Sequence, residues 1–271
     1  MNDLQKLETE LKLRAFSPRT IQSYLFYNKK FLEFIKKGPE QINEDDIKSY
    51  IVSLMERDIS PKSIILIKSA LKFFYDEILK KNIVNIKSPK VPKKLPVVLT
   101  REEVKRLIDS IENEKHRLIV ALLYSSGLRL SELVNLKVGD IDLKEKIGWV
   151  RSGKGAKDRL FIIPNALMDD LKRHFRRRTE TDYIFEGYKG AMSPRNVQKI
   201  VSLAVKNAGI NKPVHVHTLR HSFATHLLES GENIRKIQVL LGHSQLSTTQ
   251  LYLNISTEEL KKVKSPLDDL K

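Results

Sequence analysis

The sequence predicts a mainly α-helical protein of two domains, the second of which contains a β-hairpin. Three observations predict this fold class. Apolar residues recur at helical spacing over most of the chain, a stretch rich in proline and lysine interrupts them at 87–98, and the period changes to two between 147 and 163. We therefore expect a helical domain over 1–86, a linker over 87–98 and a second domain over 99–271.

Four helices are expected in the first domain. Ser17-Pro18 and Ser60-Pro61 open two of them, because serine caps free backbone amides and proline fits the first helical turn. Asn43 opens another, and the three acidic residues that follow it suit the positive end of the helix dipole. Apolar residues mark the helical faces at residues 4–13, 21–35, 47–54 and 64–78.

The second domain is expected to be helical around its β-hairpin. Its first helix opens with Thr100 and Glu103, the residue pair of a capping box. Helices are expected at residues 100–107, 116–124, 131–136, 165–177, 194–208, 218–229, 234–241 and 248–253. The chain is expected to end in a short C-terminal arm at about 257–271.

Residues that alternate with a period of two predict the hairpin. They are Ile147, Trp149 and Arg151 before the Gly153-Lys154-Gly155 turn, and Arg159, Phe161 and Ile163 after it. We expect Trp149 to pack within the hairpin. Lys154 and Lys157 both lie on the turn, so from spacing alone either lysine could reach a site there.

Charge and composition limit the function. The 271 residues include 49 Lys and Arg against 33 Asp and Glu, a formal net charge of +16. Such an excess favours a polyanionic partner, commonly nucleic acid, although a solvated basic surface is the alternative from composition alone. The absence of cysteine excludes disulfides, thiolate zinc sites and a cysteine nucleophile. Without an apolar run of about 20 residues or a signal-peptide core, we expect a cytoplasmic protein with no membrane partner.

Three motifs supply arginine, histidine and tyrosine side chains. G-L-R-L-S-E-L puts Arg129 at the entry to a helix, and H-T-L-R-H puts His217, Arg220 and His221 on one helical face. L-G-H-S contains His243 and is followed by Tyr252. Arginine forks can hold the non-bridging oxygens of a phosphate, lysine or histidine can protonate a leaving alkoxide, and tyrosine can act as an oxygen nucleophile. This set fits phosphoryl transfer without a metal or other cofactor, and the histidines lack the spacing of a zinc site.

In their order and separations, these motifs resemble those of the tyrosine recombinases, and most closely those of the short Xer type, the archaeal enzymes included. The resemblance covers essentially the whole chain. The matching motifs are G-L-R-L-S-E-L at 127–133, G-K-G-A-K-D-R at 153–159, H-T-L-R-H at 217–221, L-G-H-S at 241–244 and the region of Tyr252. The resemblance implies an N-terminal four-helix, SAM-like core-binding domain and a helical catalytic domain.

The resemblance also implies roles for six catalytic residues. Arg129 and Arg220 would clamp the scissile phosphate, and Tyr252 would attack it to form a 3′-phosphotyrosyl bond. Lys154 would protonate the 5′-oxygen leaving group. His217 would give acid–base support, and His243 would hydrogen-bond the phosphate. Two further residues, Glu132 and His221, are interpreted as supporting groups.

The function implied is site-specific recombination of double-stranded DNA with inverted half-sites, through a Holliday junction. Four protomers would assemble on two DNA sites, and the C-terminal arm would dock on a neighbouring protomer. The expected task is the resolution of chromosome or plasmid dimers at a dif-like site on the nucleoid, with a DNA translocase or accessory protein as a further partner. The alternatives are a type IB-like topoisomerase and a catalytically silent DNA-binding accessory factor.

Overall fold

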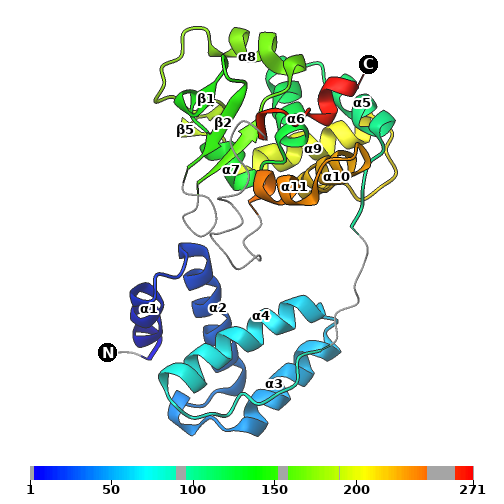
Figure 1. The fold of residues 1–271 in the computed structure, drawn as a ribbon. Helices are drawn as coiled ribbons and strands as arrows, with labels where there is room; N and C mark the ends of the chain where they lie inside the picture. Colours follow the sequence, from blue (N-terminus) through cyan, green and yellow to red (C-terminus); the bar gives the residue numbers. More distant parts are fainter. Residues whose placement is uncertain (1–2, 90–95, 152–157, 189, 243–259, 271) are drawn as a thin grey trace. The chain divides into compact units, whose positions relative to one another are not determined.

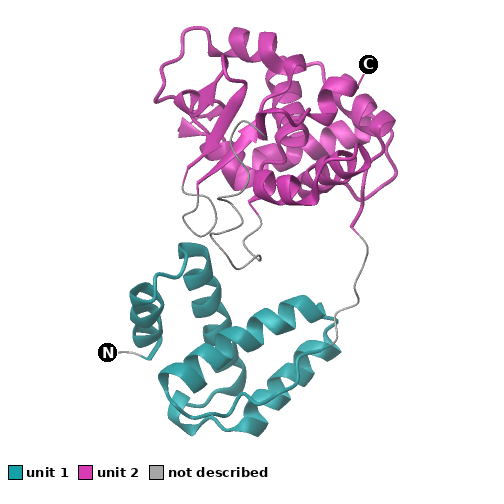
Figure 2. Cartoon of the chain, in the orientation of Figure 1, with its two compact units in different colours: residues 1–94 teal, residues 95–271 magenta. Residues whose placement is uncertain are grey.

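The computed structural model describes residues 3–89, 96–151, 158–188, 190–242 and 260–270. The chain divides into two compact units, Met1–Lys94 and Leu95–Lys271, which Figure 2 distinguishes by colour. Each unit has its own hydrophobic core. Helices dominate both units, and the strands of the second unit form small antiparallel sheets (Figure 1). The predicted fold class, mainly helical with a small β component, is confirmed. None of the described helices is long and apolar enough to cross a membrane.

The first unit contains the expected helices. They are α1 (Asp3–Leu13), α2 (Pro18–Ile35), α3 (Glu44–Glu56) and α4 (Pro61–Lys72), with a 3-10 turn at Pro39–Gln41. Ser17, Asn43 and Ser60 are the N-caps of α2, α3 and α4, and each side chain accepts a hydrogen bond from a backbone amide of the first turn. These helix starts are local in origin, which is why the sequence predicts them.

The end of the fourth helix differs from the prediction. Beyond Lys72 the chain continues as a π-helix over Phe73–Ile78. Four consecutive residues of this segment, from Phe73 to Asp76, are buried, whereas an α-helix with one apolar face would bury them intermittently. The carboxylate of Asp76 accepts hydrogen bonds from the amides of Ile83 and Val84, at 2.8 and 3.2 Å, and these bonds compensate for its burial.

The second unit is built around one buried helix, α6. The helices of this unit are α5 (Arg101–Asp109), α6 (Glu114–Ser126), α7 (Leu130–Asn135), α8 (Met168–Phe175), α9 (Pro194–Asn207), α10 (Val216–Glu229) and α11 (Ile234–Leu241). Every residue of α6 from Leu118 to Ser126 is buried, because α5, α8, α9 and α10 all contact it (Figure 1). The predicted helix at 248–253 lies outside the described residues.

The hairpin forms part of a three-stranded antiparallel sheet. Its strands are β1 (Ile141–Asp142), β2 (Ile147–Val150) and β3 (Arg159–Ile162), and a further pair consists of β4 (Glu186–Gly187) and β5 (Gly190–Ala191). The predicted alternation is wrong for β3, because all four of its residues are buried. Trp149 is 39% exposed instead of packed in the hairpin. Gly148 faces Phe161, whose ring leaves no room for a larger residue there: an added Cβ would lie 2.2 Å from its Cζ.

The described part of the C-terminal arm packs on its own chain. Leu260, Val263 and Leu267 are buried in the core of the second unit, and residues 266–269 form a 3-10 turn against α6 and α10. Ser265 Oγ donates to the carbonyl of Ser125 at 2.9 Å. Docking of the arm on a neighbouring protomer stays a prediction, because it concerns an assembly of several chains.

A buried histidine of α10 should make the stability of the fold depend on pH. His226 is 2% exposed and its Nδ1 lies 2.9 Å from the hydroxyl of Tyr124. Burial, and then the charge of Arg101, lower the pKa of His226. In the unfolded chain a histidine titrates near pH ~6.5, so acidification below that value protonates the unfolded state first and favours unfolding. Carboxylates of ordinary pKa, about 4, titrate below this pH range.

We therefore expect the free energy of unfolding to fall as the pH drops from 7.5 to 5.5, as measured by denaturant titration. In His226→Gln this fall should be smaller, since glutamine does not titrate. A pH dependence identical in the variant and the wild type would contradict this assignment.

Candidate active site

The site is organised around one buried carboxylate, that of Glu132. Arg129 is the N-cap of α7 and Glu132 is the third residue of that helix, so the Arg129 amide donates to Glu132 Oε2 at 2.8 Å. The Arg129 side chain returns to the same carboxylate, with Nη1 at 2.6 Å from Oε1. The predicted supporting role of Glu132 thus has a geometric basis: it fixes both the backbone and the guanidinium of Arg129.

Two further arginines surround Glu132. Arg159, from β3, places Nη2 at 2.6 Å from Oε2, and Arg220, from α10, places Nη1 at 3.9 Å from the same oxygen. Burial alone would raise the pKa of Glu132, but the charges and hydrogen bonds of Arg159 and Arg129 hold it below its ordinary value. Three guanidinium groups against one carboxylate leave an excess of positive charge, which is what an anion-binding site requires.

The same three arginines bind consecutive carbonyls at the end of α11. Arg159 donates to Leu240, Arg220 to Leu241 and Arg129 to Gly242, the last of these at 2.9 Å. The final carbonyls of a helix have no partners within the helix and carry its negative partial charge, so cations are favourable there. These contacts connect the arginines to the residue that precedes His243 in the sequence.

Arg220 is held almost entirely inside the protein. Its side chain is 7% exposed, and Nη1 donates to the carbonyl of Gly127 at 2.5 Å. Burial, followed by the charges of Arg129 and Arg159, lowers the pKa of Arg220 to about 9, so the group stays positive at neutral pH. Gly127 has a φ of +57° and lies against Phe223, so a Cβ there would be both strained and 2.6 Å from Cδ1 of that ring.

The histidines of α10 lie at the rim of the site. His217 and His221 are exposed and lie in the first and second turns of the helix. Burial and the neighbouring charges of His217 and Arg220 lower the pKa of His221. Of the three residues predicted to share a face, Arg220 is buried and the two histidines are exposed. A groove beside His217, between α9 and the start of α10, is also lined by Arg195 and Lys199.

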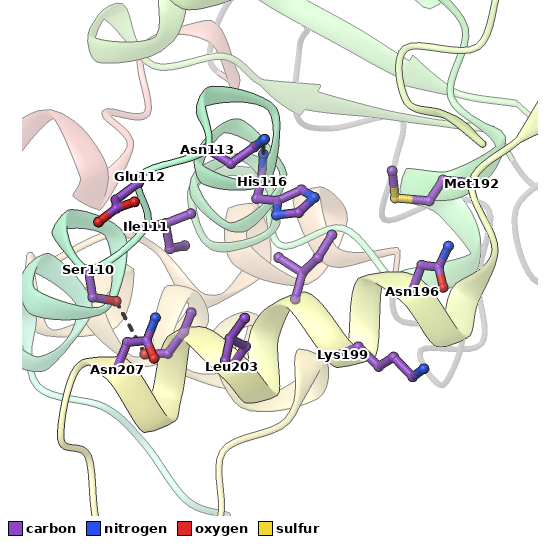
Figure 3. A pocket seen from close by; sticks show the side chains of 12 residues that line it. Ser110, Ile111, Glu112, Asn113, His116, Met192, Asn196, Lys199, Leu203 and Asn207 are labelled. Atoms are coloured by element: carbon purple, nitrogen blue, oxygen red, sulfur yellow. Dashed lines mark hydrogen bonds between the residues drawn. The ribbon is translucent and has the colours of Figure 1, made fainter. Parts of the chain in front are cut away.

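A larger cavity lies between α9 and the start of α6, away from the arginine cluster (Figure 3). Figure 3 shows His116 above α9, with Asn196, Lys199 and Leu203 along that helix. Its lining contains neither an arginine nor a tyrosine. This composition does not provide the groups that phosphoryl transfer needs, so the arginine cluster is the better candidate for the active site.

Of the six predicted catalytic residues, the structure brings Arg129 and Arg220 together around Glu132. His217 lies on α10, about one turn before Arg220. Lys154, His243 and Tyr252 lie outside the described residues.

Sequence reasoning missed Arg159. We interpreted it as one residue of an alternating strand, whereas it is 7% exposed and paired with Glu132. The alternation itself contained the signal, because it placed Arg159 on the same face as Phe161 and Ile163. A charged side chain on an apolar face is buried only with a partner, and such a partner is evidence of a site.

Each of the two units matches a known protein family model. The model of the "Phage integrase family" matches residues 97–259, and that of the "Phage integrase, N-terminal SAM-like domain" matches residues 4–84. The chain is 43% identical over 267 residues to tyrosine recombinase XerA of Thermococcus kodakarensis, and the match covers 96% of this chain and 93% of that protein. The XerA protein of Pyrococcus furiosus is also 43% identical, with 96% and 91% covered.

Solved structures give the same result. The crystal structure of XerA recombinase matches with a TM-score of 0.53 and 34% identity over 96% of this chain and 95% of that one. The XerH site-specific recombinase, solved bound to its difH substrate in a pre-cleavage complex, matches with a TM-score of 0.73 and 25% identity over 92% and 81%. The chain therefore belongs to the phage integrase family, as a Xer-type tyrosine recombinase that catalyses site-specific recombination of DNA.

Proposed function

We propose that Arg129 and Arg220 hold the scissile phosphate and that Tyr252 attacks it to form a 3′-phosphotyrosyl bond. The observation that carries this proposal is the cluster of three arginines around the single carboxylate of Glu132. Negative charge develops on the non-bridging oxygens as the phosphate becomes five-coordinate, and fixed guanidinium groups stabilise that charge without reorganising. Glu132 orients the guanidiniums and takes no part in the bond changes.

Three further residues complete the proposed reaction. Lys154 protonates the 5′-oxygen as it leaves, His217 gives acid–base support and His243 donates a hydrogen bond to the phosphate. The exposed position of His217 at the rim, beside a groove with two other basic residues, supports its contact with DNA. The phosphotyrosyl bond conserves the energy of the broken phosphodiester, so rejoining requires neither ATP nor a metal.

The two units would share the work of holding DNA. We assign core binding to residues 1–86 of the first unit and cleavage to residues 99–271, with residues 87–98 as the linker. Both assignments are supported by the separate family models that match these regions. Most of the +16 charge then serves to hold the duplex through its phosphates.

The biological task we propose is the resolution of chromosome or plasmid dimers at a dif-like site in the nucleoid. The site would be double-stranded DNA with inverted half-sites, and four protomers would exchange strands between two sites through a Holliday junction. The similarity to XerH, a protein solved on its difH substrate, supports this task. A DNA translocase or an accessory protein would control when the exchange occurs.

Recombination of a plasmid tests this function. A cognate site is first selected by the protein from a random duplex library, and two copies are placed in direct repeat on a supercoiled plasmid. We expect two smaller circles in a buffer with EDTA and no ATP. A control plasmid without the site should stay supercoiled. Relaxation of the control plasmid would indicate a topoisomerase, and binding without any product would indicate an accessory factor.

A further inference from the structure

Arg159 is as deeply buried as Arg220 and far more deeply buried than Arg129. Its side chain is 6% exposed, compared with 21% for Arg129. Nη2 binds Glu132 at 2.6 Å and Nη1 binds the carbonyl of Leu240, so this one side chain joins β3 to α7 and α11. Gly242 packs directly against it: a Cβ on Gly242 would lie 2.6 Å from Arg159 Cδ.

The burial of Arg159 is poorly explained by stability. Its Nε is buried and has no hydrogen-bond partner among the described residues, which is a cost to folding. A buried ion pair commonly stabilises a protein no more than apolar residues of the same volume. Glu132 also has a second close cationic partner in Arg129, so Arg159 is not needed to neutralise it.

Its contacts are the ones that orient the proposed clamp. Glu132 presents Oε2 to Arg159 and to the Arg129 amide, and Oε1 to the Arg129 guanidinium. Fixing Oε2 therefore fixes the direction in which Oε1 holds Arg129. Arg159 also binds the carbonyl of Leu240. The next two carbonyls along the chain, those of Leu241 and Gly242, are bound by Arg220 and Arg129.

We propose that Arg159 is a positioning residue for strand cleavage, which acts on the phosphate clamp through Glu132 and through the end of α11. The inference rests on the proposed function of Arg129 and Arg220. Arg159 itself does not touch the DNA, because it is covered by Glu132, Leu240 and Gly242. Misplacement of reacting groups by about 1 Å costs roughly 100-fold in rate, and this is the effect we expect from its loss.

The test measures single-turnover cleavage at saturating protein, with a nicked substrate whose released fragment diffuses away. Arg159→Met is compared with a control variant, Arg178→Met. Arg178 is also largely buried, donates to two backbone carbonyls and pairs with Glu186 at 3.2 Å, but it lies outside the arginine cluster. We expect Arg159→Met to cleave about 100-fold more slowly, with unchanged DNA affinity and salt dependence. Arg178→Met should cleave at the wild-type rate.

Two readouts separate positioning from a merely structural role. On a methylphosphonate substrate one charged non-bridging oxygen is absent, so a misplaced guanidinium matters less and the deficit of Arg159→Met should shrink. The double variant Glu132→Gln/Arg159→Met should lose less rate than the two single losses combined would predict, because part of the effect of Arg159 passes through Glu132. If Arg159→Met melts well below the wild type, Arg159→Lys is used, and it should cleave at an intermediate rate.

Wild-type cleavage by folded Arg159→Met would overturn the inference, as would additive deficits in the double variant or a deficit unchanged by methylphosphonate. Failure of the proposed function would look different, since Tyr252→Phe would then retain the covalent adduct, whatever the rate of Arg159→Met.

Discussion

Replacement of Arg220 by alanine should lower the rate of DNA strand cleavage about 1000-fold, the upper range for loss of one preorganised donor group. The guanidinium of Arg220 is held by the carbonyls of Gly127 and Leu241, so it is in place before the substrate arrives. Lysine cannot replace it, because a single ammonium lacks the planar fork that reaches two carbonyls and two phosphate oxygens at once. We expect Arg220→Lys to recover little of the lost rate.

Binding of DNA should change far less than cleavage in Arg220→Ala. One buried arginine contributes to one phosphate, whereas many exposed Lys and Arg residues contribute to the affinity through the whole duplex. The experiment measures the dissociation constant by titration and the cleavage rate at saturating protein, and Arg178→Ala serves as a control for loss of a covered arginine. Equal losses of affinity and rate would mean that Arg220 grips DNA and does not stabilise the transition state.

Features set by short-range chemistry could be predicted from the sequence. The N-caps at Ser17, Asn43, Ser60 and Thr100 each depend on residues within one turn, and all four begin helices as expected. The antiparallel pairing of β2 with β3 is also as expected, although the predicted alternation does not hold along β3. The change to a π-helix at Phe73 could not be predicted, because it depends on tertiary packing: residues from the rest of the first unit bury this segment from Phe73 to Asp76 without a break.

The site shows the same division between local and tertiary information. Arg129 and Glu132 lie on one helical turn, so their pairing is a local property of the motif. The partners of Arg159 and Arg220 are carbonyls of α11, and no spacing rule connects β3 or α10 to that helix end. Resemblance to the family motifs was enough to predict a role for Arg220. Arg159 also lies in one of these motifs, but the resemblance implied no role for it, and its place in the site is known only from its tertiary contacts.

Tyr252 should be required for every covalent product of the reaction. Removal of its hydroxyl oxygen in Tyr252→Phe removes the proposed nucleophile and leaves the arginine cluster intact, so DNA binding should persist while cleavage disappears. A matched control is Tyr188→Phe in the same unit, since Tyr188 is 100% exposed and outside the cluster. That variant should behave as the wild type does.

The most direct test of the account is the covalent adduct on a nicked DNA substrate that is labelled on the strand segment 5′ of the scissile phosphate, the segment that a 3′-phosphotyrosyl bond retains. After denaturation, wild type and Tyr188→Phe should carry the labelled DNA, and Tyr252→Phe should carry none. An adduct that persists in Tyr252→Phe at the wild-type level would contradict the central claim that Tyr252 attacks the phosphate.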